Sequence, residues 1–72
     1  MSTKQQIRIV INGEARSVAH GQSISELLRA LEIAPERVAV ELNRRIVKPG
    51  EWADTLVAEG AEVEIVQFVG GG

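Results

Sequence analysis

The chain contains no cysteine and no tyrosine, and it has one histidine. The absence of cysteine excludes a thiol nucleophile, a disulfide framework and thiolate metal ligands. Trp52 and Phe68 are the only aromatic residues and the net charge is −2, so we expect no nucleic-acid partner. A single histidine without other ligands or a nucleophile predicts neither a metal site nor an independent enzymatic activity.

Long hydrophobic runs are also absent. Apolar stretches extend over only a few residues, far below the length of a membrane span, and the polar start at residues 1–6 lacks the apolar segment of a secretion signal. These features predict a cytoplasmic protein with no membrane partner. With 72 residues, 44% of them hydrophobic, the chain has the size and composition of one small globular domain.

Turn residues, caps and hydrophobic periodicity predict the order of the secondary structure. Asn12-Gly13 is typical of a type I′ hairpin turn. Ser23 and Glu26 fit a capping box, and Pro35 limits how far the helix after them can extend. The expected elements are strands over 7–11 and 14–18, a helix from residue 24 to residues 31–33, a strand over 38–42, a turn over 43–45, a short strand over 46–47, an irregular connection over 49–56 that contains a helical turn, and a last strand from residue 62.

This order predicts an α+β fold of the β-grasp type, with a mixed sheet of four or five strands covered on one face by one main helix. We expect a β-grasp domain over residues 1–66, including a polar extension over 1–6, and a flexible tail over 67–72. Trp52 is expected in a satellite of the core. The main core is expected to contain Ile7, Ile9, Leu27, Leu28, Leu31, Val40 and Ile65.

The C-terminal end carries the candidate functional residues. Gly70, Gly71 and Gly72 have no side chains, so they can enter a narrow slot in a partner and present the Gly72 carboxylate to a reaction. Val66 and Phe68 fall on the strand face opposite the inward residues, which predicts an apolar docking patch beside the tail. A strand packed on both faces would explain them equally well, and the three glycines would also fit an inert, disordered end.

An ordered set of segments, from about Ile7 to the last residue, carries a family resemblance: Asn12-Gly13-Glu14, residues 38–43, Glu51-Trp52, residues 56–60, residues 63–66 and residues 68–72. Together they resemble the ThiS-type sulfur carriers of thiamine biosynthesis, which have the ubiquitin-like β-grasp fold. Two departures from that family are the residues before the first strand and Asn43-Arg44, where an Asn-Gly turn is usual. The second departure predicts a different turn type or a positive φ at Arg44.

The resemblance implies a carrier cycle at Gly72. A ThiF-type adenylating enzyme would use ATP and Mg to form an acyl-adenylate, and sulfur from a cysteine desulfurase or rhodanese-like donor would displace AMP to give a thiocarboxylate. Adenylation is needed because an ionised carboxylate repels nucleophiles and has only oxide as its leaving group. Thiazole synthase would receive the sulfur. The chain itself would bind no cofactor, Gly70 and Gly71 would thread the tail, and Val66, Phe68 and Val69 would dock the partner.

Three other interpretations remain open at this stage. The small subunit of molybdopterin synthase is a related carrier that gives its sulfur to a pterin precursor. A ubiquitin-like modifier would instead be joined to lysines of other proteins, and such an adduct would identify it. A plain interaction domain with a frayed end would be unaffected by removal of Gly71 and Gly72.

Overall fold

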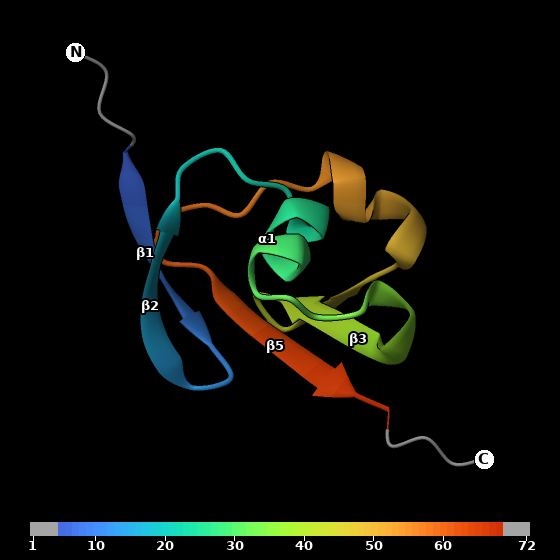
Figure 1. Cartoon of the computed structure of the whole chain (residues 1–72). Helices are drawn as coiled ribbons and strands as arrows, with labels where there is room; N and C mark the ends of the chain where they lie inside the picture. The colour runs from blue at the N-terminus through green and yellow to red at the C-terminus, as the bar shows by residue number, and fades with distance from the viewer. Residues whose placement is uncertain (1–4, 69–72) are drawn as a thin grey trace.

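Five strands form one mixed sheet in the order β2-β1-β5-β3-β4, and one helix lies across a face of it (Figure 1). The computed structural model of the protein describes residues 5–68. Central β5 runs parallel to β1 and antiparallel to β3. This is the expected ubiquitin-like β-grasp fold, here with five strands. Its elements are β1 (Gln6–Ile11), β2 (Glu14–Ala19), α1 (Ile24–Ala30), the 3-10 helix η1 (Pro35–Arg37), β3 (Val38–Leu42), β4 (Arg45–Val47), the 3-10 helix η2 (Pro49–Asp54) and β5 (Glu62–Gln67).

Both hairpins turn through two residues with positive φ. Asn12 (φ 50°) and Gly13 (φ 85°) join β1 to β2, as the sequence predicts. Asn43 (φ 52°) and Arg44 (φ 70°) join β3 to β4, so of the two alternatives expected for this turn the structure has the positive φ at Arg44. The expectation that Arg45 belongs to the turn is wrong, because Arg45 pairs with Leu42 as the first residue of β4.

Replacing Arg44 tests the strain in the second turn. Arg44→Gly is expected to raise the free energy of unfolding by about 1 kcal/mol, because a side chain at positive φ costs about 1–2 kcal/mol and the flexibility of glycine offsets part of the gain. The ion pair lost, from Arg44 Nε to Glu62 Oε1 at 3.7 Å, joins two exposed side chains and stabilises little. Urea unfolding measures the change. Arg45→Gly is the matched control, because it introduces glycine into β4, and it should lower the free energy of unfolding. A lower free energy of unfolding for Arg44→Gly would contradict the expectation.

A capping box starts α1, as expected. The Glu26 N–H donates to Ser23 Oγ at 3.1 Å, and the Ser23 N–H donates to Glu26 Oε1 at 2.9 Å. The helix ends at Ala30 with Leu31 as its C-cap, close to the predicted end, and Glu32 turns the chain with φ 61°. α1 is therefore a short helix of two turns that depends on packing against the sheet for its stability.

The core lies between α1, η2 and the covered face of the sheet. The predicted core residues are buried except Leu31, which packs half-buried at its edge. Trp52 on η2 is buried, and its Nε1–H donates to the Val47 carbonyl at 2.8 Å. It belongs to the main core cluster and not to a satellite of it, which corrects the expectation. Six side chains are the largest fully buried ones: Ile9, Ile24, Leu27, Leu28, Val40 and Val63.

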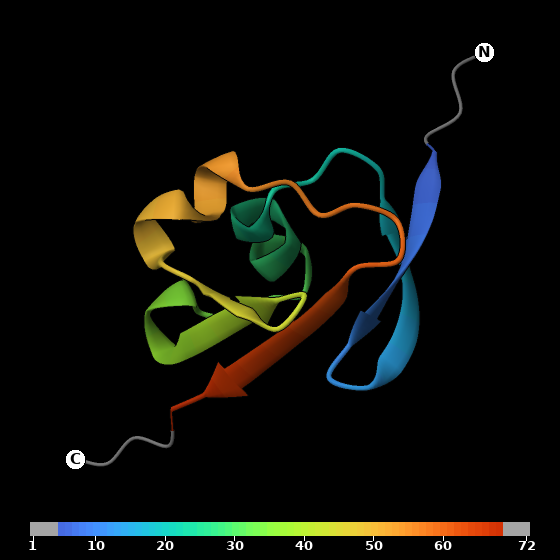
Figure 2. The same cartoon turned by 180° about the vertical axis from the view of Figure 1, so that it is seen from behind.

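The opposite face of the sheet is not covered by any helix of residues 5–68, as Figure 2 shows from behind. We call it the open face. In the same described part of the chain, no helix has the length and apolar character needed to cross a membrane. The open face is thus the large surface of the sheet that is left to interact with other molecules.

Candidate functional site

The last strand carries the chain from the middle of the sheet toward the glycines. Val63 and Ile65 point into the core, whereas Val66 and Phe68 are 55% and 57% exposed. Pairing with the β3 side continues to the last described residue, since the Phe68 N–H donates to the Arg37 carbonyl at 2.8 Å. β5 includes Gln67, the first residue of the predicted tail segment. The site predictions for Val69, Gly70, Gly71 and Gly72 lie outside the described residues.

Val66 and Phe68 belong to an apolar patch on the open face. Val66 lies directly opposite Ala39 of β3, and Ile46 of β4 is 75% exposed on the same face. We call these four residues, Ala39, Ile46, Val66 and Phe68, the outer patch. Three of them are exposed and Ala39 is half-buried. Exposed apolar side chains that gather on one face are typical of protein interaction sites. The outer patch includes Phe68, the last described residue, so a partner bound to it would also be close in sequence to the three glycines.

A row of carboxylates borders the outer patch. Glu41 and Glu64 lie directly opposite each other on β3 and β5, and Glu41 is also opposite Ile46. Like charges in this arrangement destabilise a sheet, and neither carboxylate forms a salt bridge within residues 5–68. The two carboxylates therefore add negative charge beside the outer patch and slightly destabilise the sheet.

Two asparagine side chains fix β5 from its two sides. The Ile65 N–H donates to Asn12 Oδ1 at 2.8 Å, and Asn12 Nδ2–H donates to the Ile65 carbonyl at 3.2 Å. On the other side, the Glu62 N–H donates to Asn43 Oδ1 at 2.9 Å and the Asn43 N–H donates to the Glu62 carbonyl at 2.7 Å. Both asparagines hold the strand that leads to the tail.

The chain has one histidine, His20. His20 lies exposed in the turn after β2, with its backbone N–H donating to the Gln5 carbonyl at 2.9 Å. Within residues 5–68, no group of three or more histidine, cysteine, aspartate or glutamate side chains is placed to hold a metal ion. What the site offers chemically is an interaction surface and a strand that ends beside it.

Residues 9–72 match the ThiS family. The chain belongs to that family. It is 32% identical over 66 residues to the sulfur carrier protein ThiS of Escherichia coli, a match that covers 92% of this chain and all of the relative. The crystal structure of a thiamine biosynthesis protein (ThiS) from Geobacter metallireducens superposes with a TM-score of 0.81 at 36% identity, over 92% of this chain and 100% of the other.

Two thiazole synthases also contain a segment that is similar to this chain. The thiazole synthase of Magnetococcus marinus is 38% identical to it over 66 residues, which cover 92% of this chain but only 20% of the synthase. The chain thus spans about a fifth of the length of this relative and of a second thiazole synthase, from Paramagnetospirillum magneticum. In these relatives, a ThiS-like segment and a thiazole synthase share one polypeptide.

Two contacts that shape the candidate site were not predicted from the sequence. Asn12 and Asn43 were recognised only as turn formers, whereas their carboxamides also bind β5. The contact between Asn12 and Ile65 spans 53 positions along the chain. The only local signal for these two contacts is that asparagine, rather than aspartate or glycine, begins each turn.

Proposed function

We propose that the protein is a sulfur carrier of thiamine biosynthesis whose Gly72 carboxylate is adenylated and converted to a thiocarboxylate. The observation that carries the proposal is the ThiS-family match, which extends through Gly72 on a chain that spans the whole E. coli carrier. The β-grasp fold supports it, because central β5 leads directly toward the three glycines. The proposal requires a free α-carboxylate on Gly72.

The chemistry takes place on partners, and the chain supplies the carboxylate. A carboxylate oxygen attacks the α-phosphorus of ATP on a ThiF-type enzyme that holds Mg²⁺, and pyrophosphate leaves. The terminal sulfur of a persulfide, from a cysteine desulfurase or rhodanese-like donor, then attacks the acyl carbon and AMP leaves. A thiol reduces the resulting disulfide and releases the thiocarboxylate. The chain binds no cofactor in this cycle, which depends on ATP and reducing thiols and is therefore assigned to the cytoplasm.

The outer patch and the carboxylates beside it form the proposed docking surface for the activating enzyme. Interfaces of this kind have an apolar centre surrounded by charged groups, and negative charge on one partner is matched by positive charge on the other. We propose Val66 and Phe68 as contacts, with Val69 following them toward the tail. Gly70 and Gly71 then thread the slot that leads to the ATP site.

Phe68→Ala should weaken activation without weakening the fold. Because the ring is 57% exposed, its removal should leave the Tm nearly unchanged, whereas loss of an aromatic contact at an interface should raise the KM for the carrier about tenfold. Pyrophosphate release by the ThiF-type enzyme measures the KM. The matched control is Leu56→Ala, which removes a side chain that is 62% exposed outside the outer patch. A large drop in Tm would make Phe68 a core residue instead.

The destination of the sulfur separates the proposal from its alternatives. The likeness to two thiazole synthases favours thiazole formation as the step that consumes the thiocarboxylate. The test supplies the thiocarboxylate form to thiazole synthase together with the enzyme's other substrates, and the thiazole product is expected. Transfer of the sulfur to a pterin precursor by molybdopterin synthase, or attachment of the chain to lysines, would contradict the proposal.

A further inference from the structure

The backbone groups of β5 alternate between its two neighbours. The Phe68 N–H donates to the Arg37 carbonyl, so the even-numbered residues of β5 direct their N–H and C=O groups toward β3. The odd-numbered residues direct theirs toward β1. The Val63 carbonyl accepts from the Asn12 N–H at 2.9 Å, and both backbone groups of Ile65 bind the Asn12 side chain. The next odd-numbered residue is Gln67.

Gln67 has no strand beside it on this side. Pairing between β1 and β5 ends at Ile11 and Val63, and the chain then turns back at Asn12-Gly13. Beyond the hairpin tip, Figures 1 and 2 show β3 along one side of β5 and no other strand of the described chain along the other. The Gln67 N–H and C=O therefore form an unpaired edge within residues 5–68, next to the start of the tail.

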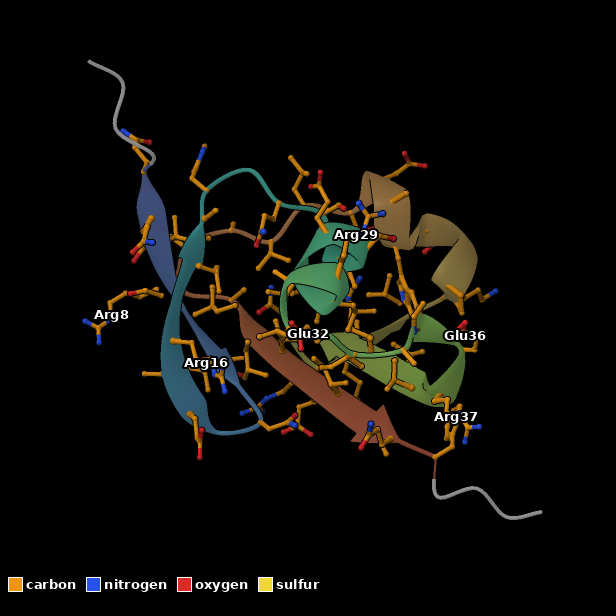
Figure 3. The ribbon with its side chains drawn as sticks, viewed as in Figure 1. Arg8, Arg16, Arg29, Glu32, Glu36 and Arg37 are labelled. Carbon is orange, nitrogen blue, oxygen red and sulfur yellow. The ribbon has the colours of Figure 1, made fainter. Side chains whose placement is uncertain are left out.

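A groove runs along this edge on the helix side of the sheet. Its apolar lining includes Ile11 and Ile65 at the sheet and half-buried Leu31 and Ile33 after α1. The rest of the lining is polar: Arg16 (Figure 3) and Glu14 of β2 contribute charges of opposite sign, and Asn12 and Gln67 complete it. An unpaired strand edge next to apolar pockets is the arrangement that binds an extended segment of another protein, whose backbone pairs with the edge while alternate side chains enter the pockets.

We propose that the enzyme that activates the tail adds an extended segment of its own to β5 at Gln67 and places an apolar side chain in the groove. The inference rests on the proposed function. A partner that holds Gly72 must come within five residues of Gln67, a span of at most about 18 Å. The bond from Phe68 to Arg37 occupies the β3 side, so the β1 side is the backbone edge that remains open. The other side chains of the added segment would face the outer patch.

Gln67→Pro tests the proposed backbone pairing. Proline removes the Gln67 N–H, which the sheet's own pairing does not use, so the Tm should stay near that of the wild type. The KM for the carrier in adenylation is expected to rise about tenfold, because one interface hydrogen bond is lost and the ring hinders the added strand.

The matched control is Ser17→Pro on edge strand β2. The bond from the His20 N–H to Gln5 shows that the even-numbered residues of β2 face β1, so the Ser17 N–H points outward. The KM of the Ser17→Pro carrier should therefore equal that of the wild type.

The other outcomes each decide the inference. An unchanged KM for Gln67→Pro overturns it, as does an equal rise for Gln67→Ala, which would assign the effect to the side chain. If Gln67→Pro lowers the Tm, Ile33→Ala tests the groove directly; a raised KM supports the inference and an unchanged KM overturns it. If the wild-type chain itself is not adenylated, the proposed function fails and the inference fails with it, an outcome seen without any variant.

Discussion

Leu28→Ala is expected to lower the free energy of unfolding by about 2–5 kcal/mol. Leu28 is 1% exposed and belongs to the cluster between α1 and the sheet, so its truncation removes buried apolar surface and leaves a cavity that a close-packed core only partly fills. Small domains without disulfides have only a few kcal/mol of stability in total. The variant should therefore be largely or completely unfolded at about 37 °C.

Thermal unfolding followed by circular dichroism measures this effect. Leu56→Ala is the matched control, because it removes the same atoms from a side chain that is 62% exposed, and its Tm should stay close to that of the wild type. If Leu28→Ala lowers the free energy of unfolding by less than about 1 kcal/mol, the surrounding core has closed over the space left by the side chain. The packing of α1 would then not be the main source of stability.

Removal of Gly72 should abolish activation by the ThiF-type enzyme. The shortened tail would place its carboxylate about 3.5 Å short of the ATP phosphorus, one residue of extended chain. Misplacement of a reacting atom by 1 Å can already cost about a hundredfold in rate, so adenylation should fall at least that far. The fold should be unaffected, because the buried core cluster is built from residues between Ile7 and Ile65.

ATP–pyrophosphate exchange on the adenylating enzyme measures the loss. A chain shortened by Met1 at the other end is the matched control, because the family match begins only at residue 9. Its exchange rate should equal that of the full chain. If the chain without Gly72 supports the same exchange rate as the full chain, the Gly72 carboxylate has no role in activation, and an interaction domain is favoured.

The elements that sequence analysis predicted correctly have signals contained within a few residues. Asn12-Gly13 specifies its turn through positive φ, and Ser23 with Glu26 specifies the start of α1 through two hydrogen bonds three residues apart. The alternation of Val63 and Ile65 with outward glutamates determines which face of β5 is buried. These signals suffice for the β-grasp fold because each of them agrees with the same order of elements.

The features that were missed depend on contacts between distant parts of the chain. The carboxamide of Asn12 binds Ile65 only because the parallel pairing of β1 and β5 ends at that level of the sheet. The same ending leaves Gln67 with an open edge, which no local pattern around Gln67 reveals. Arg45 was assigned to the turn together with Asn43 and Arg44, whereas a two-residue turn makes it the first residue of β4.

The candidate site was predictable in part. The change of apolar face between Ile65 and Val66 indicated an exposed patch, and the exposure of Val66 and Phe68 agrees with it. Local periodicity could not show that Ala39 and Ile46 from two other strands extend this patch. The roles of Gly70, Gly71 and Gly72 rest on the ThiS resemblance and remain predictions.

The intact mass of the chain tests the central proposal most directly. The protein is incubated with MgATP, a ThiF-type adenylating enzyme, a persulfide donor and a thiol, and its mass is compared with that of the untreated chain. Replacement of one carboxylate oxygen by sulfur predicts a gain of about 16 Da, located by fragmentation at Gly72. No gain, in a mixture that converts a known ThiS carrier, would contradict the proposal that this chain carries sulfur on its last residue.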